Sequence, residues 1–186
     1  MNNLNLITLA SLPTWELLVI IIFSMIGLYV IAILVIYFLM KRVQKKAFSE
    51  LDSLIVYEKE RMQFVNDLVA VLEASNYHLK DNIKVVVDEQ NDLLSSKRVD
   101  MSKAKQQTDF LLIYFQKLLK EKGIRKKEPF AKYYEDINKY LFIDSESDNY
   151  PYKKYNNLAA KYNSFLSLGL FSILTHGKNN PQAPTL

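Results

Sequence analysis

The feature that most constrains the chain is an apolar stretch near its start. Residues 17–40 read LLVIIIFSMIGLYVIAILVIYFLM and contain no charged side chain. About 20 apolar residues in a helix cross the hydrocarbon core of a bilayer, which is about 30 Å thick. A buried core helix is the alternative, but such helices rarely stay apolar on every face over this length. The stretch therefore predicts a transmembrane helix.

The charges beside this stretch predict its orientation. No lysine or arginine precedes it. Four membrane-proximal basic residues follow it: Lys41, Arg42, Lys45 and Lys46. Because lysine and arginine are enriched on the cytoplasmic flank of a span, we expect residues 1–16 to be an extracytoplasmic tail and residues 41–175 a cytoplasmic domain. A cleaved signal peptide would need a basic segment before the apolar run, a shorter run and a small-residue cleavage site. We therefore expect a single-pass protein of the cell membrane.

Composition restricts the chemistry that the chain can perform. The 186 residues include no cysteine, two histidines and four glycines. They therefore offer no thiolate metal site, little material for a histidine-based site and no glycine-rich phosphate loop. The net charge of +4 comes from intermixed signs, which is typical of a solvated helical surface rather than a nucleic-acid interface. We expect no catalytic residue, cofactor, metal, nucleic acid or small-molecule substrate.

The spacing of apolar residues beyond the span predicts long helices. Residues 28–122 contain neither glycine nor proline, so no residue there forces the backbone out of helical geometry. Apolar residues recur every three or four positions over 51–72 and again over 79–94. We expect the span to continue into the first cytoplasmic helix without a break. Either a bend near Ser75 or one helix that continues to about residue 94 fits this pattern.

Further helices follow. One is expected at about 103–122, with Asp100 or Ser102 as its N-cap and Gly123 at its end. Pro129 and Pro151 are expected to begin two more. The predicted fold class is all-α, with one N-terminal transmembrane helix followed by an antiparallel bundle of long helices. We expect residues 176–186 to form a disordered C-terminal tail.

The last helix carries the most specific pattern in the chain. Residues 153–163 read KKYNNLAAKYN, with two Tyr-Asn pairs seven residues apart. Seven residues come within about 20° of two full turns, so Tyr155 and Tyr162 share one face, and Asn156 and Asn163 share the next. Because buried amides need partners, we expect both asparagines to bond to neighbouring helices and set the register of the bundle. The alternative is a pair of exposed Tyr-Asn dipeptides.

This pattern resembles the final helix of the LemA family, in which a basic pair precedes Tyr-Asn and a second Tyr-Asn follows one heptad later. Residues 169–171, Gly-Leu-Phe, are similar to the family's terminal segment, and residues 60–69, ERMQFVNDLV, are similar to its first-helix motif. Lys153 and Lys154 stand where the family usually has arginines, and Asn66 stands at its proline. The resemblance implies a bacterial membrane protein with one N-terminal span, a bundle of long antiparallel helices with coiled-coil-like packing, and a biochemical role that is not established for the family.

These observations favour a function in binding rather than in catalysis. We expect a non-enzymatic adaptor or scaffold that is held in the lipid bilayer and acts through contacts with an unidentified protein partner. The alternative is a membrane-surface module that binds anionic lipid. Residues 165–174, FLSLGLFSIL, fit a core segment, an interfacial segment or a partner site.

Overall fold

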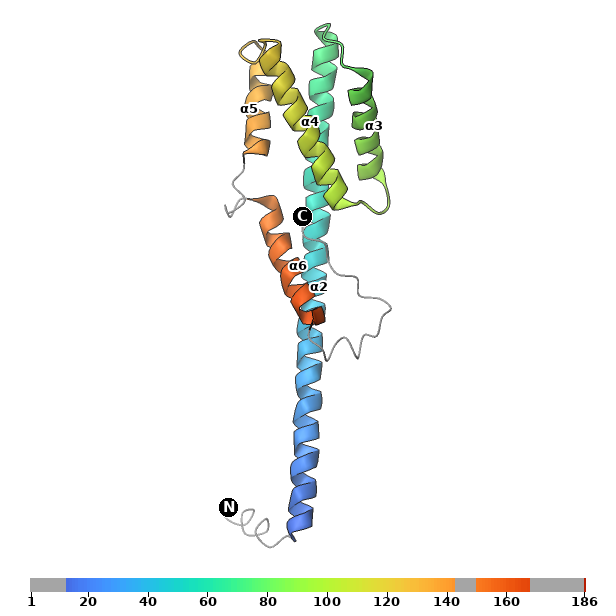
Figure 1. Ribbon diagram of the computed structural model, residues 1–186, viewed down its shortest axis with the longest axis vertical. Coiled ribbons are helices and arrows are strands. Elements are labelled where there is room, and N and C mark those ends of the chain that lie inside the picture. The colour runs from blue at the N-terminus through green and yellow to red at the C-terminus, as the bar shows by residue number, and fades with distance from the viewer. Residues whose placement is uncertain (1–12, 143–149, 168–185) are drawn as a thin grey trace. The chain divides into compact units, whose positions relative to one another are not determined.

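The computed structural model describes residues 13–142, 150–167 and 186. Five helices and no strand occur in this part of the chain (Figure 1). The helices are α2 (Thr14–Ala74), α3 (Asp81–Ser95), α4 (Met101–Glu121), α5 (Phe130–Leu141) and α6 (Pro151–Ser167). The prediction of an all-α fold is confirmed. The outer tail before residue 13, the acidic loop at 143–149, the Gly-Leu-Phe segment and residues 176–185 lie outside the described residues.

The chain divides into two compact units, residues 1–43 and residues 44–186. The described part of the first unit is α2 up to residue 43. Most of its large apolar side chains over residues 18–39 are exposed; Phe23, for example, is 69% exposed. A core helix of a soluble protein would bury such side chains. This helix is long and apolar enough to cross a membrane, and it is the one such helix among the described residues. Its orientation stays a prediction.

The chain leaves α2 at a left-handed turn. Asn76 has a φ of 60°, a conformation that asparagine tolerates better than most residues. The N–H of Tyr77 donates to the carbonyl of Leu72 over 2.9 Å and closes the last turn. The helix therefore ends at Ala74. Of the two alternatives that the sequence left open, the structure shows the break near Ser75 and excludes one helix that continues to about residue 94.

Local capping explains the bounds of α4. The Asp100 side chain accepts a hydrogen bond of 3.1 Å from the N–H of Lys103, so the predicted N-cap is confirmed at that residue. At the other end Gly123 has a φ of +66°, which a residue with a Cβ adopts at a cost. Both signals act over a few residues, which is why the sequence alone could predict them.

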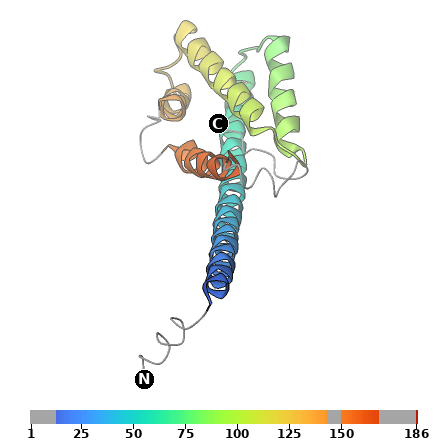
Figure 2. The ribbon, with the colours of Figure 1, turned by 60° about the horizontal axis from the view of Figure 1, so that its bottom comes forward.

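Residues 44–186 form a helical bundle with two apolar clusters. Within this unit α3, α5 and α6 run opposite to α2 and α4, and α3 and α5 lie on opposite sides of α4 (Figures 1 and 2). The larger cluster joins α2, α3, α4 and α5, and its fully buried members include Leu68, Leu111, Phe115 and Ile137. The smaller cluster joins α2, the start of α4 and α6: Leu54, Met101, Tyr152, Tyr155 and Ala159. The polar groups described next lie beside this smaller cluster.

Candidate functional site

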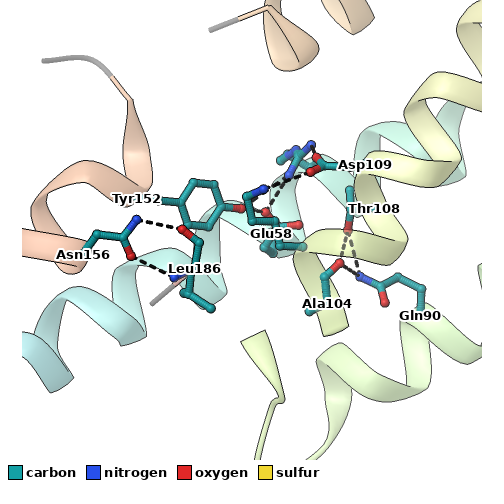
Figure 3. A network of polar contacts seen from close by, with 10 residues as sticks. Glu58, Gln90, Ala104, Thr108, Asp109, Tyr152, Asn156 and Leu186 are labelled. Atoms are coloured by element: carbon teal, nitrogen blue, oxygen red, sulfur yellow. Dashed lines mark hydrogen bonds and ion pairs between the residues drawn. The ribbon is translucent and has the colours of Figure 1, made fainter. Parts of the chain in front are cut away.

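A buried charged network connects three helices of the bundle. Glu58 and Arg61 are 0% and 2% exposed on α2, and the guanidinium Nη1 donates to Glu58 Oε1 over 2.7 Å. The Nη2 of Arg61 also donates to Asp109 of α4. The Tyr152 hydroxyl of α6 donates to Glu58 (Figure 3). One ion pair on α2 therefore holds groups from α4 and α6.

The electrostatics of this network favour a positioning role. Burial by itself lowers the pKa of Arg61, but Glu58 and Asp109 outweigh that effect and leave the pKa above its usual value. Burial raises the pKa of the adjacent Tyr57 to about 12, although Arg61 acts in the opposite direction. General acids and bases work best with a pKa near the operating pH, and neither residue meets that condition near neutrality.

The network is not fully satisfied. Glu58 Oε2 and Arg61 Nε are buried and have no hydrogen-bond partner in the described part of the chain. Buried polar atoms without partners cost stability. The network therefore specifies which helices meet more than it stabilises them.

A pocket of about 290 Å³ opens beside this network. Four tyrosines contribute to its wall: Tyr57, Tyr140, Tyr150 and Tyr152. The ammonium of Lys105 lies 5.4 Å from the ring centre of Tyr152 and pairs with Asp109 over 3.1 Å. Because the cations of the pocket are matched by acids, this pocket has little net charge to attract an ion.

A second polar contact lies between α3 and α4. The Gln90 side-chain amide donates to the carbonyl of Ala104 and to the hydroxyl of Thr108, each over 2.8 Å (Figure 3). Gln90 and Thr108 are fully buried. The contact sets the register of α3 against α4. The sequence analysis predicted this kind of role for the asparagines of α6, not for Gln90.

The sequence analysis did not identify these buried polar residues, although a signal was present. The apolar stripe of α2 is interrupted between Ile55 and Met62, and Glu58 and Arg61 occupy the stripe positions in that gap. Gln90 occupies a similar gap in α3. A charged or amide side chain at a core-facing position can therefore be found by its spacing, but its partner cannot.

The Tyr-Asn pattern of α6 has the predicted geometry. Tyr155 and Tyr162 are both buried, whereas Asn156 and Asn163 are half-buried on the neighbouring face. The Tyr162 hydroxyl accepts a hydrogen bond of 3.2 Å from the side-chain amide of Gln44. Burial raises the pKa of both tyrosines above its usual value. The tyrosines therefore act as core residues.

Asn156 binds a peptide backbone. Its Nδ2 donates to the carbonyl oxygen of Leu186 over 2.7 Å, and the N–H of Leu186 donates to its Oδ1 over 2.9 Å (Figure 3). The side chain of Leu186 packs on the smaller apolar cluster. The expected partner of Asn156, a neighbouring helix, was wrong, because the amide pairs with a backbone segment distant in sequence. A carboxamide offers one donor and one acceptor, as a backbone amide does.

A groove of about 590 Å³ adjoins Leu186. Its wall follows one face of α4 and includes Lys105, Phe110 and Ile113 together with Leu186. Phe110 and Ile113 are 50% and 55% exposed. This part of the bundle therefore combines backbone recognition by Asn156 with accessible apolar surface.

The four basic residues after the span lie on α2 on both sides of the boundary between the two compact units. Lys41 and Arg42 belong to the first unit, and the Lys41 ammonium lies 5.9 Å from the ring centre of Tyr37. Lys45 and Lys46 belong to the second unit, where Lys46 lines a groove with side chains of α6. Among the described residues there is no group of three acidic or histidine side chains that could hold a metal ion.

Comparison with known protein families, with characterised proteins and with solved structures finds no significant match. The functional argument therefore rests on the sequence and on the geometry described above.

Proposed function

We propose that this chain is a LemA-like, single-pass membrane protein whose cytoplasmic domain acts as a non-enzymatic adaptor or scaffold through contacts with a partner protein. The observation that supports this most directly is the pair of hydrogen bonds between Asn156 and the backbone of Leu186. These bonds are made to Leu186 of the chain itself, and a partner segment that takes the place of Leu186 would form the same two bonds with its own backbone.

The surroundings of Asn156 indicate which partner segment fits. The side chain of Leu186 packs on an apolar cluster, and the adjoining groove presents Phe110 and Ile113. An extended segment of a partner would displace Leu186, pair its backbone with Asn156 and cover the exposed apolar side chains of α4 with its own. Such a segment combines backbone hydrogen bonds for affinity with apolar pockets for specificity. The partner therefore carries a short extended segment with leucine-like side chains.

Site-specific photocrosslinking in intact membranes tests this function. The photoreactive amino acid p-benzoylphenylalanine replaces Phe110 in the full chain. The matched control replaces Val85, which is 54% exposed on α3. We expect position 110 to form a discrete protein adduct that position 85 does not form.

The same measurement with Asn156→Ala separates specific docking from chance proximity. Loss of two hydrogen bonds, each worth about 0.5–1.5 kcal/mol, should weaken the complex by about 5- to 150-fold and reduce the adduct accordingly. Identical adducts from positions 110 and 85, or an adduct that Asn156→Ala leaves unchanged, would contradict the proposal. The alternative function, binding of anionic lipid, concerns a different surface of the bundle, between α2 and α6.

A further inference from the structure

A groove between α2 and α6 carries an excess of positive charge. Its volume is about 340 Å³. Lys46, Ser49 and Glu50 of α2 face Lys154, Asn157 and Lys161 of α6 across it. The positions on α6 are three and four residues apart, so they recur on one face of that helix. Residues far apart in the sequence therefore contribute to one basic surface.

The charges of this groove are only partly compensated. Glu50 forms an ion pair with Lys154. Lys46 and Lys161 are exposed and have no acidic partner within the described ranges. Three ammonium groups against one carboxylate leave a net charge of +2 in the groove. Lys46 belongs to the basic cluster that follows the span. Lys154 and Lys161 are distant in sequence and lie beside it because α6 packs near α2.

The remaining polar groups suit a phosphate. Ammonium groups are donors without acceptor capacity, and the Ser49 hydroxyl and the Asn157 amide can donate as well. Hydrogen bonds from charged donors to phosphate oxygens are among the strong ones in proteins. The groove, at about 340 Å³, is large enough for a phosphate with its glycerol, and Leu158 adds an apolar side chain to the wall.

The chain itself limits where this groove can be. Lys46 follows Met40, the last residue of the apolar stretch, by six residues. Six residues reach at most about 20 Å even when fully extended. The groove is therefore confined to the vicinity of the headgroup layer if residues 17–40 span the bilayer, and anionic lipid is concentrated on the cytoplasmic side.

We propose that the groove between α2 and α6 binds the phosphate of an anionic phospholipid headgroup through Lys46, Lys154 and Lys161. This inference rests on the membrane span and is independent of partner binding at Asn156. Bound lipid would connect α6 with the membrane surface, in addition to the covalent connection through α2.

Native mass spectrometry of the full chain, released from detergent micelles, tests the proposal. The protein is incubated with equal amounts of phosphatidylglycerol and phosphatidylcholine, and the ratio of their adducts is measured. The variant Lys154→Gln/Lys161→Gln should lower the preference for phosphatidylglycerol by about 25-fold, the product of about fivefold for each cation near an anionic lipid. The control Lys84→Gln/Lys139→Gln removes the same charge from lysines that pair with Glu73 and Asp136. It should change the preference less than about threefold.

The two double variants distinguish a defined lipid site in the groove from general electrostatic attraction between the protein and anionic lipid. Equal losses in the two double variants, or no loss in either, would overturn the proposal, and circular dichroism of each variant checks that its total helix content is unchanged. A parallel experiment adds inorganic phosphate, with chloride at the same ionic strength as its control. Retention of the phosphatidylglycerol preference in phosphate supports a lipid site, whereas its loss in phosphate alone would assign the groove to free phosphate instead.

Discussion

Replacement of Arg61 by methionine should destabilise the bundle strongly, although it keeps the volume of the side chain nearly constant. The guanidinium is 2% exposed and bonds to Glu58 and Asp109. Without it, Asp109 keeps its 3.1 Å pair with Lys105 and is 33% exposed, so it loses little. Glu58 is fully buried and keeps only the Tyr152 hydroxyl. The loss should therefore come from one uncompensated buried carboxylate.

The magnitude follows from this geometry. Removal of one partner of a buried ion pair costs about 3–5 kcal/mol, against a total stability of about 5–15 kcal/mol for an ordinary domain. The variant Glu58→Gln/Arg61→Met removes both charges and keeps an acceptor for Tyr152. Because neutral replacements of buried ion pairs are often close to neutral in stability, this double variant should recover to within about 1–2 kcal/mol of the parent. Arg61→Met should then cost about 1–4 kcal/mol more than the double variant, and the coupling from the double-mutant cycle is at least this large because the cost of Glu58→Gln alone adds to it.

Urea unfolding of residues 44–186, followed by circular dichroism at the helical minimum, measures these differences. The control Lys84→Met breaks an ion pair with Glu73 whose side chains are 45% and 44% exposed, and it should cost much less stability than Arg61→Met because exposed ion pairs contribute little. If Arg61→Met costs no more than this control, the network does not act as described. A double variant as unstable as Arg61→Met would likewise refute the assignment of the cost to Glu58.

Three further predictions concern the whole chain and its compact second unit. Residues 44–186, produced without the span, should be soluble and predominantly helical; a sheet-like circular dichroism spectrum would contradict the fold. Because the chain has no cysteine, Ser11→Cys and Ser145→Cys provide clean topology probes, and a membrane-impermeant thiol reagent on intact cells should label position 11 alone. Labelling at position 145 alone would invert the proposed orientation. The pKa of Tyr57, raised by burial to about 12 from an unfolded value of about 10, should make the unit lose stability as pH rises through this window, because the unfolded state releases the proton first. The loss in urea unfolding should be smaller in Tyr57→Phe, and an equal loss in both proteins would exclude this tyrosine as a source.

The helices themselves follow from local sequence. The apolar stretch at 17–40, the periodicity beyond it and the residues at helix ends predicted the start of α2 and the approximate bounds of α4, and they predicted that α5 and α6 begin near Pro129 and Pro151; they left open whether α2 and α3 are one helix or two. Asp100 caps α4, and Gly123 ends it in the left-handed region. Such signals operate within one or two turns, so they can be read without knowledge of the tertiary structure.

Side chains that act across long sequence separations could not be paired in this way. Glu58 and Tyr152 are 94 positions apart, and Arg61 and Asp109 are 48 positions apart. Hydrophobic periodicity identifies the face of a helix that is buried, but it does not indicate which helix covers that face. The same applies to the groove at Lys46, because its two other lysines come from α6.

Asn156 shows the boundary between the two kinds of information most clearly. Its heptad relation to Asn163 placed both on one face of α6, and the half-burial of both residues agrees with that placement. The sequence could not identify its partner, because a carboxamide pairs equally well with a helix side chain or with a backbone. Only the tertiary structure shows that the partner of Asn156 is the backbone of Leu186, because a contact over 30 positions depends on which residues the folded chain brings together.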